Sequence, residues 1–206
     1  MAKIPAERND DRSAGSAAIR EHGMIDRPTE DVDLFTTRDA VGQGFKAAVE
    51  ATITRLREAG YEVTQTREAA EFARLGVQTP EGSSVDIDLA VDWRLAHPVI
   101  LDIGPVLALE DAVGNKVGAL FGRAEPRDYL DVDDIRATGR FSDEQLLVAA
   151  AERDPGFDST MFARQLQLAT YLTPEEVSRY GVTPSQLEAI KSRCTSWAHV
   201  LRNGLG

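Results

Sequence analysis

The most regular alternation of apolar and polar residues in the chain runs from residue 84 to residue 92. Because successive side chains of a strand point to opposite faces, this alternation predicts a strand with one apolar and one acidic face. An edge strand whose acidic face is solvated is one interpretation of the pattern. The apolar positions are Val85, Ile87, Leu89 and Val91, and the opposite positions are Asp86, Asp88, Ala90 and Asp92.

A shorter run of the same kind covers residues 31–35, where Asp31 and Asp33 alternate with apolar residues. Two carboxylates on one side of a short strand repel each other unless a cation lies between them. A hard divalent cation such as Mg²⁺ is bound by one or two carboxylates together with substrate phosphates. Residues 16–22 are expected to form a short helix whose first backbone N–H groups suit a phosphate. Together these features indicate nucleotide chemistry.

The rest of the chain mixes helical and extended patterns, which predicts an α+β fold. Apolar residues at helical spacing predict one helix from Thr37 or Asp39 to about Gly60, another at residues 110–122, and several within residues 141–206.

Two further extended runs lie at residues 61–66 and 71–79, and turn residues at 80–83 join the second run to the acidic strand as a hairpin. The pattern therefore predicts three parts along the chain. These are a flexible N-terminus at residues 1–13, a core of mixed sheet and flanking helices at residues 14–108, and a helical half at residues 109–206.

Composition narrows the functional classes. The 206 residues, 42% of them hydrophobic, are enough for a globular core, and no apolar run approaches the ~20 residues of a membrane span. The first residues lack the apolar core of a signal peptide, and the single Cys194 excludes an internal disulfide, so we expect a cytoplasmic protein. The net charge of −11 argues against a broad nucleic-acid surface, although arginines between Arg123 and Arg140 allow a local basic site.

The segment from Gly15 to Asp33 resembles the nucleotidyltransferase fold of the DNA polymerase beta superfamily. There a Gly-Gly or Gly-Ser pair, here Gly15-Ser16, precedes an Asp-x-Asp strand. The resemblance extends to the AbiEii/AbiGii toxins of type IV abortive-infection and toxin–antitoxin systems, which carry an Arg and a Ser or Thr before Asp-x-Asp. Arg27 and Thr29 stand at these places.

A second signature of the same branch is a Lys-x-x-Ala-Leu segment followed by an Arg and an Arg-Asp-x-x-Asp box. It is matched by Lys116-Val-Gly-Ala-Leu, then by Arg123, and then by Arg127-Asp128-Tyr-Leu-Asp131. The resemblance implies a polymerase beta-like mixed sheet with a C-terminal helical half. It also implies Lys116 on the triphosphate, with the Arg-Asp-x-x-Asp box supporting the nucleotide pocket.

The resemblance further implies an enzyme that uses Mg²⁺ or Mn²⁺ and an NTP, adds nucleotides to tRNA ends and has a cognate antitoxin. It implies a third metal-binding carboxylate on the acidic strand, for which we prefer Asp88 and place Asp86 second. The expected metal ligands and catalytic residues are Asp31, Asp33 and Asp88. The expected nucleotide-binding residues are Gly15, Ser16, Arg27, Thr29, Lys116, Arg123, Arg127, Asp128 and Asp131.

Several alternatives fit the same residues. Lys116 within an apolar stripe is also typical of a lysine that snorkels to the surface, and Asp128 and Asp131 are also typical of helix-start carboxylates. The acceptor could be a small-molecule or protein hydroxyl, which the negative charge favours. A catalytically silent binding partner is a third hypothesis, because Arg12 and Ser13 predict no apolar strand before Gly15.

Overall fold

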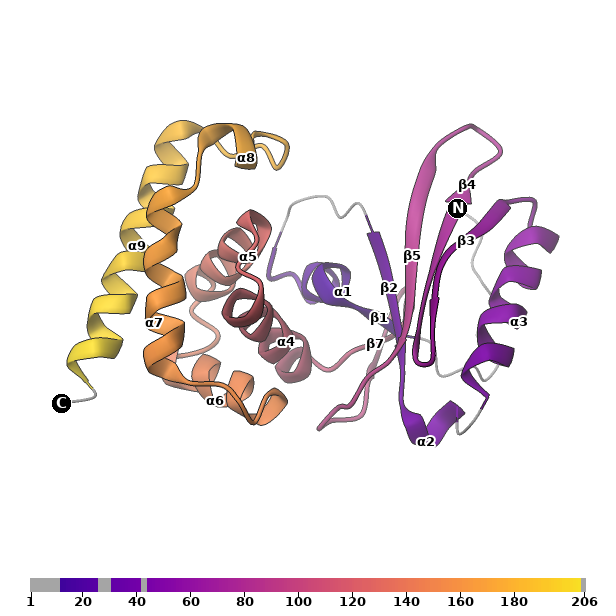
Figure 1. Cartoon of the computed structure of the whole chain (residues 1–206), viewed down its shortest axis with the longest axis horizontal. Helices are drawn as coiled ribbons and strands as arrows, with labels where there is room; N and C mark the ends of the chain where they lie inside the picture. The colour runs from indigo at the N-terminus through magenta and orange to yellow at the C-terminus, as the bar shows by residue number, and fades with distance from the viewer. Residues whose placement is uncertain (1–11, 26–30, 42–43, 205–206) are drawn as a thin grey trace. The chain divides into compact units, whose positions relative to one another are not determined.

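The structure is a computed structural model, and it describes residues 12–25, 31–41 and 44–204 (Figure 1). The chain divides into two compact units. The first comprises Met1–Glu21 and Thr29–Ala108, and the second comprises His22–Pro28 and Leu109–Gly206. The second unit thus holds the predicted helical half and also a short segment that the sequence analysis assigned to the core.

The first unit is built on a mixed sheet, which has seven strands within the described residues in the order β3-β4-β5-β2-β1-β7-β6. At its centre β2 and β5 run parallel, and β4 flanks β5 as an antiparallel neighbour. The α+β fold is therefore confirmed. The strands are β1 (Arg12–Ala14), β2 (Asp31–Thr36), β3 (Glu62–Ala69), β4 (Phe72–Gln78), β5 (Ser84–Val91), β6 (Val99–Leu101) and β7 (Gly104–Val106).

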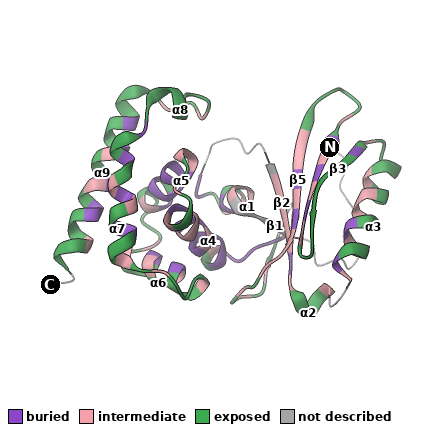
Figure 2. Ribbon diagram, viewed as in Figure 1, coloured by how far each residue is buried: buried purple, intermediate pink, exposed green. Residues whose placement is uncertain are grey.

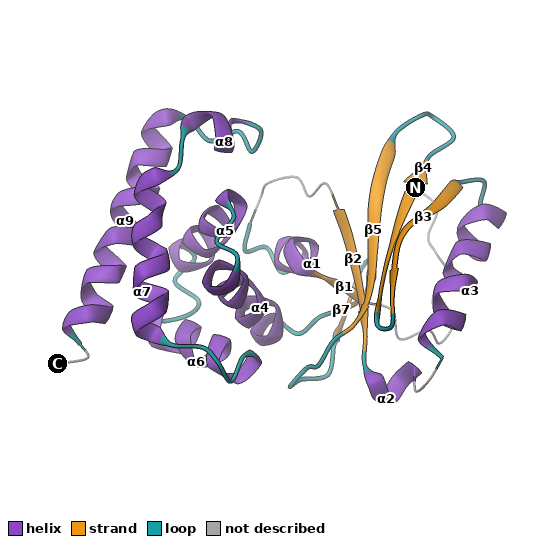
Figure 3. Cartoon of the chain, viewed as in Figure 1, coloured by secondary structure: helices purple, strands orange, loops and turns teal. Residues whose placement is uncertain are grey.

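One face of this sheet is covered by α3 (Phe45–Glu58), which lies along the side formed by β3, β4 and β5 (Figure 3). Phe45 and Val49 of the helix belong to one buried cluster with Leu75 of β4 and Leu89 of β5. Burial alternates along β4 and β5, and Figure 2 shows that α3 is exposed on the side that faces away from the sheet. The acidic positions of β5 therefore lie on the face opposite the α3 core.

Two sequence expectations about strands are wrong. The strand at residues 84–91 is not an edge strand, because β4 and β2 flank it on both sides. Arg12 and Ser13, expected in the flexible terminus, instead form β1 together with Ala14, and this strand pairs with β2 and β7. The polar sequence of β1 hides this strand, since its neighbours supply the hydrogen bonds that define it. Residues 1–11 lie outside the described residues.

The expected single helix from residue 37 or 39 to about residue 60 is two helices, α2 (Arg38–Val41) and α3. Gly44 favours an interruption before α3, because glycine costs about 1 kcal/mol relative to alanine inside a helix. Gly44 is the N-cap residue of α3. A short helix, α1 (Gly15–Glu21), follows β1 as the sequence predicts.

The second unit is helical in its described residues. Its buried interior includes Leu120, Phe162 and Trp197, and the rings of Phe162 and Trp197 meet edge to face with centroids 5.2 Å apart. None of the helices in the described ranges has the length and hydrophobicity that a membrane crossing requires. The elements are α4 (Leu109–Gly122), α5 (Pro126–Ala137), α6 (Asp143–Arg153), α7 (Ser159–Leu168), the 3-10 helix η1 (Ala169–Tyr171), α8 (Pro174–Ser178) and α9 (Pro184–Asn203).

Candidate active site

Two predicted metal ligands face each other across the centre of the sheet. The parallel register of β2 and β5 places Asp33 directly opposite Asp88 and Asp31 opposite Asp86. Val32 and Leu34, which alternate with Asp33, pack against the α3 cluster, so Asp33 and Asp88 share the face of the sheet opposite α3. The side chain of Asp31 lies outside the described part of the structure.

Asp88 is held by an arginine that the sequence analysis did not select. Arg74 of β4 lies opposite Asp88 in the antiparallel register. Its Nε and Nη2 atoms each donate a hydrogen bond of 2.6 Å, one to each oxygen of the Asp88 carboxylate. The Asp88 side chain is 13% exposed and that of Arg74 is 32% exposed. A short, paired, charge-assisted contact of this kind fixes the plane of the carboxylate.

A signal for Arg74 was present in the sequence. The turn around residues 79–83 pairs Gln78 with Ser84, and four residues further along each strand Arg74 meets Asp88. Once the register of the predicted hairpin is known, it places Arg74 opposite Asp88. Asp86, by contrast, lies opposite Gly76, which has no side chain to offer it.

The carboxylates on this face of the sheet offer the oxygen ligands that a hard divalent metal prefers. Within the described residues no group of three or more acidic, histidine or cysteine side chains is arranged to hold a metal ion. Two opposed carboxylates are present, and one of them, Asp88, binds the guanidinium of Arg74. Two carboxylates completed by substrate phosphates suit Mg²⁺, so the residues fit the implied metal.

The predicted phosphate-binding residues are described only in part. Gly15 and Ser16 form the start of α1, whose Ala18 and Ile19 are fully buried. Arg27 and Thr29 lie outside the described residues.

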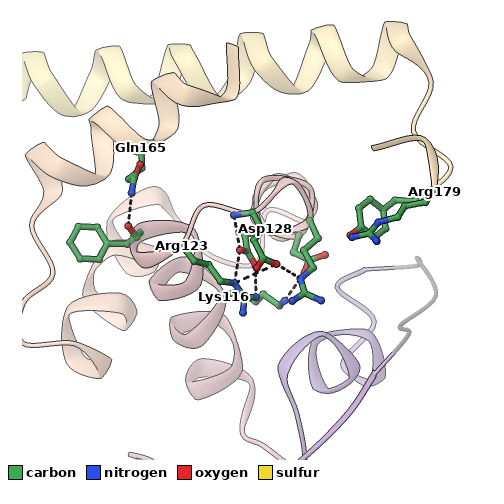
Figure 4. A network of polar contacts seen from close by, with 10 residues as sticks. Lys116, Arg123, Asp128, Gln165 and Arg179 are labelled. Atoms are coloured by element: carbon green, nitrogen blue, oxygen red, sulfur yellow. Dashed lines mark hydrogen bonds and ion pairs between the residues drawn. The ribbon is translucent and has the colours of Figure 1, made fainter. Parts of the chain in front are cut away.

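In the second unit, the buried Lys116 of α4 is held by an acidic partner. Its Nζ atom lies 2.6 Å from Oδ2 of Asp131, which belongs to α5 and is fully buried (Figure 4). The side chain of Lys116 is 5% exposed, so the interpretation as a snorkelling surface lysine is wrong. This ion pair, whose charges cancel, connects the Lys-x-x-Ala-Leu segment to the Arg-Asp-x-x-Asp box of the second signature.

Asp128 has a structural role at the start of α5. Its side chain accepts a hydrogen bond of 3.1 Å from the backbone N–H of Glu125, as part of a capping box. It also accepts two hydrogen bonds of 2.9 Å from Arg123 (Figure 4). The interpretation as a helix-start carboxylate therefore fits Asp128. Arg127 lies beside this cap, with its Nε atom 2.9 Å from Oε2 of Glu125.

A third helix supports this region of the second unit. Gln165 of α7 donates a hydrogen bond of 2.9 Å to the backbone carbonyl of Phe121 at the end of α4 (Figure 4). The buried Tyr129 of α5 donates one of 2.9 Å to the backbone carbonyl of Gln165. Burial raises the pKa of Tyr129 to about 12. These contacts hold the signature residues of α4 and α5 on a rigid base.

The sequence matches a family model described as the nucleotidyl transferase AbiEii toxin of a type IV toxin–antitoxin system, over residues 15–195. The chain belongs to the AbiEii nucleotidyltransferase toxin family. This confirms the resemblance seen in the sequence, and an antitoxin partner is implied by the type IV system to which the family belongs. No curated protein sequence matches this AbiEii-family chain.

Solved structures share the fold of this AbiEii-family chain. JHP933 from Helicobacter pylori matches with a TM-score of 0.57 and 14% sequence identity, over 96% of this chain and 86% of JHP933. MenT4, a nucleotidyltransferase toxin from Mycobacterium tuberculosis H37Rv, matches with a TM-score of 0.55 and 19% identity, over 94% of this chain and 77% of MenT4. At these identities the likeness concerns the fold alone.

Proposed function

We propose that this AbiEii-family protein is a metal-dependent nucleotidyltransferase that transfers nucleotides from an NTP to tRNA 3′ ends and so inhibits translation and growth. The observation that carries the proposal is the opposed pair of carboxylates, Asp33 and Asp88, on the face of the sheet opposite α3. Family membership supports the transferase activity, and the metal, the NTP and the tRNA acceptor are proposals.

The residues that hold the metal in this proposal are Asp31, Asp33 and Asp88, with Asp86 as the second choice for the last position. Bound Mg²⁺ or Mn²⁺ supplies charge stabilisation to the oxygens that attack and leave in an in-line displacement at a phosphate. Asp33 and Asp88 bring negative charge from adjacent strands, and the sheet fixes their separation. A preorganised face of this kind costs little reorganisation during the reaction.

The nucleotide-binding role is assigned to the two family signatures. Ser16, next to Gly15, and Lys116 are the proposed contacts of the triphosphate, since a hydroxyl and an ammonium both donate to phosphate oxygens. Asp131 orients the ammonium of Lys116. Arg123, Arg127 and Asp128 support the start of α5, while Arg27 and Thr29 keep the role that the resemblance implies for them.

A different acceptor is the second candidate, and a specific observation favours it. The net charge of −11 opposes the approach of a polyanion such as tRNA. A small-molecule or protein hydroxyl meets no such opposition. In the silent-partner hypothesis, by contrast, the carboxylates have no catalytic role at all.

One experiment separates these functions. The protein is incubated with each α-labelled NTP, Mg²⁺, total RNA and a cell extract, and the label is followed into RNA, protein and small-molecule fractions. We expect label at tRNA 3′ ends. Label in protein or small molecules alone rules out the tRNA acceptor, and no label in any fraction supports the silent partner.

The matched variants are Asp33→Asn and Asp102→Asn, which remove the same charge from the same unit. Asp102 is exposed in the turn between β6 and β7. We expect transfer by Asp33→Asn to fall by about a thousandfold, because a metal-binding carboxylate is worth several kcal/mol to the transition state. Asp102→Asn retains activity. Equal activity of the two variants contradicts the proposed catalytic role of Asp33.

A further inference from the structure

Four charged residues lie in one row across the sheet, on the face opposite α3. The registers of neighbouring strands pair Asp33 of β2 with Asp88 of β5, Asp88 with Arg74 of β4, and Arg74 with Arg67 of β3. Directly opposed side chains on adjacent strands lie close enough to interact. The row therefore passes from two acidic positions to two basic positions.

The contact at the centre of the row uses both oxygens of Asp88. The two hydrogen bonds from Arg74 measure 2.6 Å each, at the short end for a guanidinium and a carboxylate. Asp33, Asp88 and Arg74 together carry a formal charge of −1, whereas Asp33 and Asp88 alone carry −2. A divalent cation at Asp88 meets the repulsion of a guanidinium that is already in place.

We propose that Arg74 is a positioning residue that orients Asp88 and competes with the metal for it. The inference rests on the proposed function, because it takes Asp88 to be a metal ligand. Arg74 holds the carboxylate in plane while no metal is bound, and a metal at Asp88 either displaces one of its two contacts or shares a carboxylate oxygen with the positively charged guanidinium. The affinity of the site for metal is thereby set below that of the carboxylates alone.

The test measures metal binding directly, without substrate. Mn²⁺ is titrated into the full-length protein, and free Mn²⁺ is followed by electron paramagnetic resonance. We expect Arg74→Gln to bind Mn²⁺ about fivefold more tightly than the wild type, because a partly exposed ion pair no longer competes. Arg74→Lys, which keeps the charge but loses the paired geometry, is expected to bind about twofold more tightly.

Arg67→Gln is the matched control. It removes the same charge from the same row, one strand further from Asp88. Its Mn²⁺ affinity is expected to equal that of the wild type. A gain in Arg67→Gln as large as that in Arg74→Gln shows a general charge effect and overturns the inference. Thermal unfolding of each variant shows whether it is folded. If Arg74→Gln is not folded, the Mn²⁺ affinity of Arg74→Lys relative to the wild type tests the inference.

The proposed function and the inference fail in different ways. Unchanged or weaker Mn²⁺ binding in the Arg74 variants overturns the inference, even if the wild type transfers nucleotides. Tighter binding in Arg74→Gln together with no transfer by the wild type supports the inference and contradicts the function. Where both hold, the Mg²⁺ concentration that gives half-maximal transfer falls in Arg74→Gln in step with the Mn²⁺ dissociation constant.

Discussion

Lys116 and Asp131 form a buried ion pair whose two members depend on each other. The distance of 2.6 Å and the near-complete burial leave water little part in neutralising either charge. Removing one partner of such a pair leaves an uncompensated buried charge, which costs about 3 to 5 kcal/mol. We expect Lys116→Met and Asp131→Asn each to lower the free energy of unfolding by about 3 kcal/mol in urea denaturation, and the double variant to lose less than the sum.

The double variant also separates a structural role of Lys116 from its proposed role on the triphosphate. If the lysine only neutralises Asp131, the double variant, which lacks both charges, recovers transfer activity along with stability. If it binds phosphate, activity stays low while stability recovers. We expect the second outcome, and recovery of nucleotide transfer would remove Lys116 from the binding site.

At the level of single residues, the sequence predicted the acidic positions better than their partners. The period of two along a strand was enough to put Asp33, Asp86 and Asp88 on polar faces. Arg74 was missed because an ion pair across strands depends on the register of a hairpin, which the alternation alone does not fix. The burial of Lys116 was equally hidden, since helical spacing places it in an apolar stripe without showing that Asp131 lies opposite.

Helices α4 and α6 approach each other at Gly114. A Cβ atom at this position would lie 2.6 Å from the backbone oxygen of Ala149 and 2.8 Å from Cγ of Arg153. The backbone of α6 at Ala149 can move only at a large cost in packing, so Gly114→Ala forces the two helices apart. We expect a loss of about 2 kcal/mol in the free energy of unfolding, more than the ~1 kcal/mol that alanine gains in helix propensity.

Gly118 provides the control for this change, one turn along the same helix. A Cβ atom at Gly118 would meet no atom within 4 Å. Gly118→Ala is therefore expected to raise the stability by up to about 1 kcal/mol through helix propensity alone. The free energy of unfolding of both variants is measured by urea denaturation. If Gly114→Ala stabilises the protein as Gly118→Ala does, the close contact between α4 and α6 at Gly114 does not restrict the size of the side chain.

At the level of elements, the helices of the second unit were the easiest to predict. Sequence signals at their starts are strong: Ser142, Thr173 and Thr183 each form a capping box with a Gln or Glu three residues later. The strand β1 could not be predicted, because its three residues, two of them polar, show no apolar alternation and gain their structure from β2 and β7. Local pattern predicts an element well only where the element's own side chains stabilise it.

For the molecule as a whole, the α+β class followed from the sequence and the family match agrees with it. The strand order did not follow, because the parallel pairing of β2 with β5 joins segments that are separated by α2, α3, β3 and β4 along the chain. That pairing brings Asp33 and Asp88 together. The family resemblance suggested their proximity, whereas local hydrophobic pattern could not, since contacts of such sequence separation leave no periodic trace.

The stability of the whole molecule at high pH depends on a buried thiol in α9. Burial of the thiol, and after it the negative charge of nearby Asp133, raise the pKa of Cys194 from 9.0 to about 12. Because the Cys194 thiol binds its proton more tightly in the folded protein than in the unfolded chain, it contributes stability that is fully present below pH 9. This contribution is lost as the pH rises towards 12. Between pH 9 and pH 10.5 the loss is about 2 kcal/mol.

Cys194→Ala is expected to flatten this alkaline loss, although it lowers stability at neutral pH through the lost side-chain packing. A residual slope remains, because the pKa of Tyr129 is also raised, from 10.0 to about 12, by burial. Urea denaturation at pH 8 and pH 10.5 gives the comparison. If the wild type and Cys194→Ala lose stability in parallel over this interval, the thiol does not ionise on unfolding, and another group must carry the pH dependence.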